Sequence, residues 1–402
     1  MNTELRNTIE QFMDETMDLN DLPGLAVGVS IGLEGDSFDG EFEYTGARGY
    51  RDYETREPLQ AGDIFHCASV SKLFTSSAIM KLVEAGALGL YDRLCNLLPD
   101  LKFEGPDEDG NIGDWRFGEI RLWNMLTHTS GLGDCFDYEW ADAETDDLSL
   151  RRYVYESDDC IRQPMLWCPQ TSPEFYGLSD DENLFRYSNV AYEILGQIVA
   201  EYSDRMPGAS GQLSYEDFVA KYLLEPAGMS NSTMKTFERD GSNMANPHAK
   251  AEDRSIRRLE VYPYNRKHAP SSTLTSCTSD LLKWGRAHMR SAGGSDGLLL
   301  QKESYDSIWR DYATVPNNGE KMGLGWFMRR QKVEDAGSTR EYVLYGHEGT
   351  DDGFRASFWM CPELEMVTVV LSNLSNAPVK RINKKLFEVI CEQVILYRQI
   401  IF

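Results

Sequence analysis

The sequence predicts an α/β (α+β) protein: an antiparallel sheet flanked by terminal helices, with an inserted, mostly helical region. Three observations predict this class. A helical pattern and strand patterns open the chain, strand patterns and a helical pattern close it, and the middle is rich in Pro, Gly and Asp with few clean strands. We expect residues 1–95 and 266–402 to form one α/β domain and residues 96–265 to form an inserted, mainly helical domain.

Apolar spacing defines the first elements. Residues 4–18 repeat apolar side chains at helical intervals, which predicts an amphipathic helix. Residues 24–31 form a continuous run of apolar and small residues, typical of a buried strand, and residues 41–45 alternate as a second strand. The pattern is helical again over residues 69–84.

Later elements follow from caps and alternation. A capped helix is expected to begin at Ser214 and to end before Pro226. Near the carboxyl end, residues 342–345, 354–360 and 366–371 predict three antiparallel strands. A final amphipathic helix is expected over roughly residues 379–400.

Composition excludes several classes of function. The chain has 402 residues, is 41% hydrophobic and carries a net charge of −25, so it repels phosphate backbones and anionic membranes. It holds no apolar run of membrane-spanning length and no basic, apolar leader at its start, so we expect a cytoplasmic protein with no nucleic-acid or membrane partner. An acidic stretch over residues 134–159 lacks the ligand spacing of a calcium loop, and we interpret it as a solvated face or lid.

Cysteine and histidine spacing gives no support for a metal site or a cofactor. The eight cysteines are scattered without a Cys-x-x-Cys pair, and no His-x-x-x-His occurs. Reduced thiols are the simplest interpretation. The sequence leaves the oligomeric state open.

Three serines lie in patterns typical of hydrolase nucleophiles. Ser30 lies in a Gly-x-Ser-x-Gly pattern, which forms a nucleophile elbow only where a strand turns sharply into a helix. Because Ser30 lies inside the apolar strand pattern and no helical pattern follows, we interpret it as a packed strand residue. Ser232 and Lys235 form a Ser-x-x-Lys pattern among turn residues, and we interpret that pattern as part of a loop.

Ser69 and Lys72 form a second Ser-x-x-Lys pattern, at the start of a helical pattern. Three residues apart on a helix, the two side chains share one face within hydrogen-bond reach. The helix amino terminus offers positive potential and free N–H groups, which suit a developing oxyanion. Desolvation and that nearby positive charge would lower the pKa of Lys72, so that its neutral amine could take the Ser69 proton. The alternative is a serine helix cap beside a solvated lysine.

Two later segments favour the catalytic interpretation. Tyr187 and Asn189 precede a helical pattern over residues 191–200 and offer a phenol hydroxyl and an amide. His347 and Gly349 come where a strand pattern ends and a turn begins.

Ser-x-x-Lys, Tyr-x-Asn and a basic-x-Gly triad, in this order, resemble the serine β-lactamase and penicillin-binding-protein superfamily. The Tyr-x-Asn form is similar to class C β-lactamases, DD-peptidases, D-aminopeptidases and related carboxylesterases. The resemblance covers roughly residues 22–373 and implies a β-lactamase/transpeptidase-like fold. Further segments in the family's order are residues 65–75, 126–132, 226–229, 323–326 and 353–355.

The resemblance implies a role for each motif residue. Ser69 would be the acylated nucleophile and Lys72 its activator, while Tyr187 would share the base role and protonate the leaving group. Asn189 would position the acyl side chain, and the backbone N–H groups of Ser69 and Thr350 would form the oxyanion hole. No cofactor is required, because water deacylates the enzyme.

The triad departs from the β-lactamase pattern. His347 replaces the usual lysine and is largely neutral near pH 7, and Glu348 brings a carboxylate to the substrate edge, where Gly349 lets the substrate lie against the backbone. Both changes weaken a pocket for a substrate carboxylate.

His128, in the loop 126–132, is expected to be structural. Substrate choice is expected to depend on the loops 134–179 and 237–270.

We therefore expect a serine hydrolase that acts through an acyl-enzyme on small-molecule esters or amides, most simply a β-lactamase-fold carboxylesterase. The alternatives are a D-amino-acid amidase or peptidase, a weak β-lactamase, and a non-catalytic binding or scaffold member of the family. Transacylation instead of hydrolysis also stays open.

Overall fold

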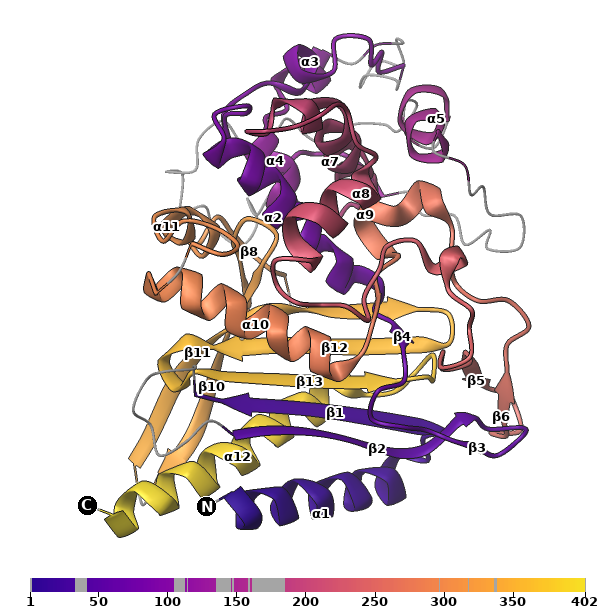
Figure 1. Ribbon diagram of the computed structural model, residues 1–402, viewed down its shortest axis with the longest axis vertical. Helices are drawn as coiled ribbons and strands as arrows, with labels where there is room; N and C mark the ends of the chain where they lie inside the picture. Colours follow the sequence, from indigo (N-terminus) through magenta and orange to yellow (C-terminus); the bar gives the residue numbers. More distant parts are fainter. Residues whose placement is uncertain are drawn as a thin grey trace.

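One large antiparallel sheet, with helices on both of its faces, organises the protein (Figure 1). The computed structural model describes residues 2–32, 42–104, 113, 115–134, 146, 148–157, 160, 185–295, 297–316, 318–335 and 338–401. Within these ranges nine strands form the sheet, in the order β3-β2-β1-β13-β12-β11-β10-β9-β8. This arrangement confirms the predicted fold class.

The two ends of the chain meet at the centre of the sheet. Strand β1 (Gly24–Ile31) is buried along its whole length and pairs with β13 (Met366–Ser372), so Leu25 lies opposite Ser372. The other strands of the sheet are β2 (Phe42–Asp52), β3 (Glu57–Pro58), β8 (Ala313–Thr314), β9 (Lys321–Met322), β10 (Phe327–Asp335), β11 (Ser338–Asp351) and β12 (Phe354–Cys361). Two small sheets pair β4 (Phe65–His66) with β7 (Thr275–Ser276) and β5 (His248–Lys250) with β6 (Ile256–Arg258).

The helices divide between the two faces of the sheet. Helices α1 (Asn2–Asn20) and α12 (Val379–Ile401) lie against one face, on the side where both termini are seen in Figure 1. The opposite face is covered by α10 (Thr278–Gly293) and by a helical layer above it. The remaining α-helices of the described residues are α2 (Ser71–Glu84), α3 (Leu94–Leu97), α4 (Leu122–Leu126), α5 (Ser149–Glu156), α7 (Asn189–Tyr202), α8 (Tyr215–Val219), α9 (Ala269–Ser272) and α11 (Ser304–Ile308).

Short helical turns complete the helical layer. Where the chain is described, the 3₁₀ turns are η1 (Ala68–Val70), η2 (Trp115–Glu119), η4 (Ser203–Arg205), η6 (Thr236–Glu238), η7 (Arg266–His268) and η8 (Pro362–Leu364). The predicted helix after Ser214 is capped by that serine, whose Oγ accepts the Asp217 N–H at 3.1 Å, and it continues past α8 as one π-helical turn, η5 (Ala220–Leu224).

Helix α2 lies in the interior of the helical layer. It packs against α7, α8 and α9, and eleven of its side chains are buried. Helix α2 lies within the expected terminal domain and α7 within the expected insertion, so side-chain packing continues between the two expected parts. The boundaries at residues 95/96 and 265/266 stay a prediction.

Strand β11 has a free edge at its carboxyl end. Its partner β10 begins at Phe327, opposite Gly346, so residues 347–351 are paired with β12 on one side only within the described part of the chain. The sequence pattern predicts a turn at His347 and Gly349. That interpretation was wrong, because β11 continues to Asp351 and the turn follows it.

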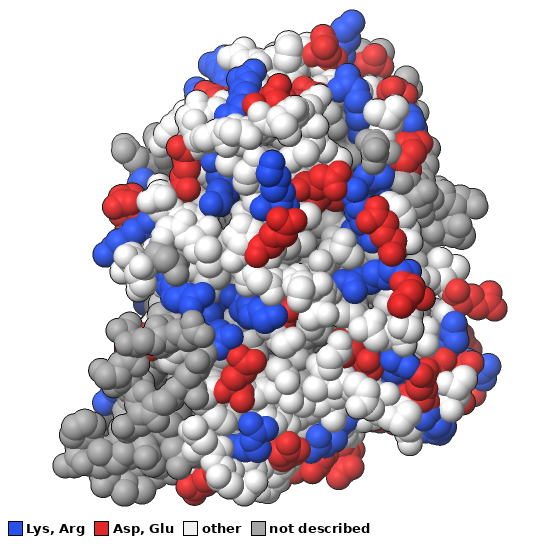
Figure 2. Space-filling view, in the orientation of Figure 1, with Lys and Arg blue, Asp and Glu red and all other residues white. Residues whose placement is uncertain are grey.

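Charged side chains of both signs are interspersed on the face shown in Figure 2. Of the acidic stretch, Asp134, Asp146 and Glu156 are described, and Asp146 pairs with Arg152 at 2.5 Å; the other acidic residues of this stretch lie outside the described ranges. No described helix is both long and apolar enough to cross a membrane. The cytoplasmic location and the absence of nucleic-acid and membrane partners stay predictions.

Gly196 should be essential for the contact between α7 and α9. A Cβ at this position would lie 2.0 Å from Pro270 Cγ, so Gly196→Ala must push the two helices apart. We expect Gly196→Ala to lower the free energy of unfolding by about 1–3 kcal/mol, measured by urea denaturation. Gly62→Ala is the control, because a Cβ there meets nothing within 4 Å, and its effect should be within about 0.5 kcal/mol. A Gly196→Ala protein as stable as the unchanged chain would contradict this packing.

Candidate active site

The nucleophile candidate lies on a strained turn between β4 and α2. Ala68, which precedes Ser69, has φ +48°, a left-handed conformation that is unfavourable for a residue with a Cβ. The predicted helix over residues 69–84 begins as the 3₁₀ turn η1 and becomes α-helical at Ser71. Ser69 is partly exposed at the cavity wall, and Lys72, three residues later, is fully buried.

The ammonium nitrogen of Lys72 lies among three oxygen atoms from three segments. Its Nζ is 3.2 Å from Ser69 Oγ, 2.7 Å from Asn189 Oδ1 and 2.9 Å from the Ser271 carbonyl oxygen. The Asn189 and Ser271 oxygens can only accept hydrogen bonds, whereas the Ser69 hydroxyl can also donate one. A neutral amine therefore fits this position well: two N–H groups bind the two acceptors, and the nitrogen lone pair is left for the Ser69 proton.

Burial makes the neutral form of Lys72 accessible. Desolvation lowers the pKa of Lys72 to about 8, against the opposing charges of Glu193, Asp134 and Asp351. The nitrogen also lies 4.9 Å from the ring centroid of Tyr187. The lysine can thus lose its proton near physiological pH and act as a base.

Tyr187 is held in place by His128. The two rings stack with centroids 4.3 Å apart, and His128 Nδ1 accepts the backbone N–H of Ser188 at 3.1 Å. His128 is fully buried, with a pKa lowered well below its usual value by desolvation and by Lys72, so its ring is neutral. This geometry supports the structural role expected for His128.

The Tyr187 hydroxyl stays protonated. Burial raises the pKa of Tyr187, and a hydrogen bond with Ser69 opposes this shift only in part. Ser188, the next residue, caps α7 by accepting the Ala191 N–H at 3.2 Å, so the helix start fixes the backbone that carries Tyr187. Tyr187 is therefore suited to donate a proton rather than to remove one.

Asn189 links Lys72 to an acidic residue. Its Oδ1 accepts from Lys72, its Nδ2 donates to Asp134 Oδ2 at 3.2 Å, and its backbone N–H donates to Asp134 Oδ1 at 2.8 Å. Asp134 thereby orients the amide so that its oxygen faces the lysine. The role expected for Asn189, contact with the acyl group, stays a prediction.

The free edge of β11 forms one wall of the site. Gly349 lies so close to the residues before Ser69 that a Cβ would be 2.2 Å from the Cys67 carbonyl oxygen. The contact between β11 and residues 66–69, the nucleophile segment, therefore requires glycine here. Thr350 follows and lines the cavity together with Ser69. The positions are compatible with an oxyanion hole from the two backbone N–H groups.

His347 contributes no positive charge to the site. Its Nδ1 donates to the Glu348 carbonyl oxygen at 2.5 Å, and its Nε2 has no hydrogen-bond partner among the described residues. Desolvation, helped by the charge of Lys72, lowers the pKa of His347 to about 3, so the ring is neutral at pH 7.

Glu348 has a different environment from the one expected. Its Oε1 accepts the Trp359 Nε1–H at 2.8 Å and is 3.9 Å from Arg329 Nη1, so the carboxylate contacts side chains of the neighbouring strands β12 and β10. Burial raises the pKa of Glu348 while Arg329 opposes that shift. The carboxylate does line the cavity, but its Oε1 is engaged by protein groups.

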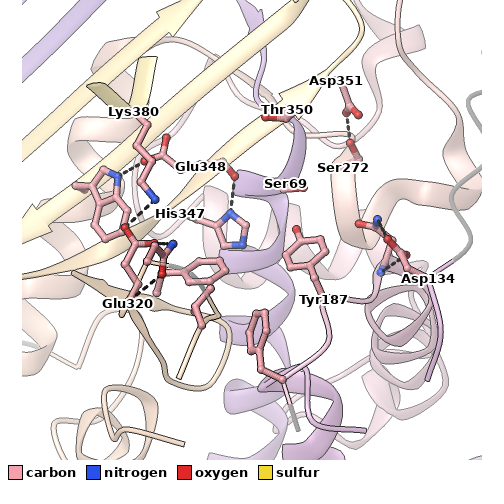
Figure 3. Close-up of a pocket in the computed structure, with 16 residues that line it drawn as sticks. Ser69, Asp134, Tyr187, Ser272, Glu320, His347, Glu348, Thr350, Asp351 and Lys380 are labelled. Carbon is pink, nitrogen blue, oxygen red and sulfur yellow. Dashed lines mark hydrogen bonds and ion pairs between the residues drawn. The ribbon is translucent and has the colours of Figure 1, made fainter. Parts of the chain in front are cut away.

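The cavity along this edge has a volume of about 480 Å³ (Figure 3). Every predicted site residue lines it except Lys72, which is buried behind Ser69, and Gly349. Its lining residues are Ser69, Asp134, Phe185, Tyr187, Asn189, Ser272, Val315, Asn318, Glu320, Phe327, His347, Glu348, Thr350, Asp351, Trp359 and Lys380.

Several lining residues were missed by the sequence analysis. Lys380 from α12 pairs with Glu320 at 2.7 Å at the end of the cavity near Glu348 (Figure 3). Within the described chain no lining residue of this cavity comes from the loop 237–270, and the role of that loop in substrate choice stays a prediction. Val315, Asn318, Glu320 and Phe327 line the cavity instead. Most of the loop 134–179 lies outside the described residues. No motif marks Lys380 or Glu320 in the sequence, since their positions depend on helix and strand packing.

A buried histidine–aspartate pair joins the nucleophile segment to β11. His66 Nε2 lies 2.7 Å from Asp351 Oδ2, and Ser272 Oγ donates to the same oxygen. His66 precedes Ser69 by three residues and Asp351 follows Thr350. The pair thus fixes the distance between the two backbone segments whose N–H groups would bind an oxyanion.

The two other serine candidates have structural contacts. Ser30 is fully buried within β1, in agreement with its interpretation as a strand residue. Ser232 Oγ bonds to Ser276 Oγ and Asp280 Oδ2, while Lys235 pairs with Asp217 at 2.8 Å instead of with Ser232. Among the described residues no group of three or more His, Cys, Asp and Glu side chains could hold a metal ion.

The fold and the Ser-Lys-Tyr arrangement are those of a β-lactamase-fold serine hydrolase. The Beta-lactamase family matches residues 5–389, so the chain belongs to this family. Among curated relatives, Penicillin-binding protein 4* of Bacillus subtilis (strain 168) is 27% identical over 205 residues, which are 51% of this chain and 37% of the relative. Protein flp of Staphylococcus aureus (strain N315) is 23% identical over 94% of this chain and 66% of the relative. The chain thus spans less than two thirds of the length of these relatives.

Solved structures share the fold. A D-amino acid amidase from Ochrobactrum anthropi SV3, complexed with L-phenylalanine amide, has a TM-score of 0.70 at 19% identity and covers 97% of this chain and 99% of its own. An octameric penicillin-binding protein homologue from Pyrococcus abyssi has a TM-score of 0.67 at 24% identity, over 96% of this chain and 76% of its own.

The protonation of Lys72 should control the pH dependence of acylation. Only the neutral amine can take the Ser69 proton, so the acylation rate should rise with pH through about 8 and then level off, while Tyr187 stays protonated. The measurement is the rate at which a fluorophosphonate labels Ser69 as a function of pH. Lys72→Met should label far more slowly and without this rise. A rate independent of pH in the unchanged protein would contradict the role of Lys72.

Proposed function

We propose that the protein is a serine hydrolase that cleaves small esters through an acyl-enzyme, a β-lactamase-fold carboxylesterase. One observation carries the proposal: Lys72 Nζ has two pure acceptors, Asn189 Oδ1 and the Ser271 carbonyl, and directs its remaining position at Ser69 Oγ. A binding or scaffold protein would have no use for a buried lysine arranged in this way, because burying it without a chemical role is unfavourable.

Acylation begins with proton transfer from Ser69 Oγ to Lys72 Nζ. The oxygen attacks the substrate carbonyl carbon, and the carbonyl electron pair moves to its oxygen, which the backbone N–H groups of Ser69 and Thr350 would stabilise. The bond to the leaving oxygen or nitrogen then breaks. Tyr187 donates its proton to the leaving atom and takes one back from Lys72, which restores the neutral amine.

Deacylation uses the same groups in the reverse direction. A water molecule loses a proton to the Tyr187–Lys72 pair and attacks the acyl carbon, and the ester bond to Ser69 Oγ breaks. The serine oxygen recovers a proton from the pair, so the cycle is balanced without a cofactor. If another alcohol or an amine entered in place of water, the same steps would give transacylation.

The charges that line the cavity favour neutral or cationic substrates. Among the described lining residues the carboxylates are those of Asp134, Glu320, Glu348 and Asp351, and the lysine, Lys380, is paired with Glu320. His347 is neutral where β-lactamases usually carry a lysine. An anionic β-lactam therefore finds no free cation at this triad.

Amides of D-amino acids are the second candidate substrates. Their free amine would be favoured by the same excess of carboxylates, and a D-amino acid amidase is among the proteins that share the fold. Activity on D-phenylalanine amide, compared with its L form and with p-nitrophenyl acetate, distinguishes this candidate from an esterase.

Ser69→Ala should abolish hydrolysis of p-nitrophenyl esters and labelling by a fluorophosphonate, with a loss of about 10³-fold or more and an unchanged melting temperature. The hydroxyl is the nucleophile and contributes little to packing at the turn. Ser232→Ala should retain most activity, because that serine lies in another hydrogen-bond network. An inactive but folded Ser30→Ala protein with an active Ser69→Ala protein would refute the assignment. A folded, unchanged protein that is never labelled would instead favour a non-catalytic member.

Neutral esters should be hydrolysed far faster than nitrocefin. Without a cation at position 347, an anionic β-lactam loses a charge-assisted hydrogen bond of about 1.5–3 kcal/mol, roughly ten- to two-hundredfold in affinity. The measurement is kcat/KM for p-nitrophenyl acetate and for nitrocefin at equal pH. Comparable values for the two substrates would show that this charge argument is wrong.

A further inference from the structure

A buried carboxylate near Lys72, that of Glu193, belongs to none of the sequence motifs. Glu193 is on α7, one helical turn after Asn189, so the two side chains share a helix face. Asn189 binds Lys72 directly. Glu193 is fully buried and does not line the cavity, so the substrate cannot reach it.

Glu193 reaches Lys72 through Ser271. Its Oε1 accepts the Ser271 hydroxyl and lies 3.1 Å from His268 Nδ1. The carbonyl oxygen of the same Ser271 accepts from Lys72 Nζ at 2.9 Å. One residue of α9 therefore holds the lysine with its backbone and the carboxylate with its side chain.

The second oxygen of Glu193 has no hydrogen-bond partner among the described residues, although it is buried. A buried carboxylate with an unsatisfied oxygen is unfavourable to folding, and an amide or an apolar side chain of similar size would avoid that cost. An acid at this position has two electrostatic partners: His268, whose Nδ1 lies 3.1 Å from Oε1, and Lys72, whose protonated form its negative charge favours.

The charges around Lys72 can be compared directly. Of the charges that favour the protonated lysine, Glu193 has the largest influence, ahead of Asp134 and Asp351. The lysine itself opposes the raised pKa that burial gives Glu193.

The groups that face Lys72 or its immediate partners are Tyr192 and Glu193 from α7, Tyr187, His128 and Asp134 from the loops, His347 and Asp351 from β11, and His268 from η7.

We propose that Glu193 is a positioning residue for Lys72: through Ser271 it holds the lysine against Ser69, and it places a negative charge next to that contact. The inference rests on the proposed function, because it concerns the base of that reaction. Without Glu193 the lysine would lose its proton at lower pH, and the carbonyl that binds it would be less firmly held.

The test is Glu193→Gln, which keeps the shape of the side chain and an oxygen for Ser271 while removing the charge. The rate of fluorophosphonate labelling at Ser69 is measured against pH, together with the melting temperature. The midpoint of the rise in rate should move to lower pH by about one pH unit or more, as expected when an opposite charge close to a titrating group is removed. Glu201→Gln is the matched control, because the same change on α7 affects a carboxylate that pairs with Arg151, Tyr155 and Gln197. Its midpoint should not move.

Two results would overturn the proposal. A folded Glu193→Gln protein whose midpoint coincides with that of the unchanged chain, or lies higher, would show that Glu193 is structural only. If Glu193→Gln does not fold, Glu193→Asp is the second variant, because it keeps the charge but withdraws it from Ser271. The midpoint of its labelling rate should stay the same, while the labelling rate at alkaline pH should fall several-fold. An undiminished alkaline rate would refute the positioning role. An unchanged protein that is not labelled at Ser69 would refute the proposed function before any variant is compared.

Discussion

The burial of Lys72 is the constraint on which the rest of the site depends. An ammonium group without solvent is stable only if surrounding oxygens replace water, and here they come from η1, α7 and α9. The oxygens from α7 and α9 belong to residues that lie 117 and 199 positions along the chain from the lysine. Their packing therefore has to be accurate before the lysine can be accommodated, and close contacts such as Gly196 against Pro270 provide that accuracy.

The sheet meets this helical layer along the free edge of β11. Because β10 begins only at Phe327, opposite Gly346, residues 347–351 are left with an open side next to the nucleophile segment. The pair formed by His66 and Asp351 holds the two segments together. Alternation along the strand sends His347 toward Tyr187 and Glu348 toward Trp359, so neighbouring residues serve opposite faces of the sheet.

Much of the fold could be predicted from the sequence, because apolar periodicity reports burial directly. The run over residues 24–31 is β1, and the pattern over 69–84 is η1 followed by α2. The strand end at 345 was misplaced, since glycines and polar residues at 346–351 have the composition of a turn. In the sheet, Gly346 is required because a Cβ would lie 2.0 Å from the Phe358 carbonyl oxygen. Close packing and turn formation favour the same residue type.

The sequence by itself determined which family the chain resembles and which side chains have the reactive groups, because Ser69 and Lys72 are related by local helical spacing. Only the tertiary structure decided the state of those groups. Burial and the surrounding carboxylates make Lys72 a base near pH 8, desolvation keeps His347 neutral, and Glu193 and Asp351 enter through contacts between distant segments. Spacing along a helix is a local property of the chain, whereas desolvation and charge depend on everything packed around a group, so they appear only once the chain is folded.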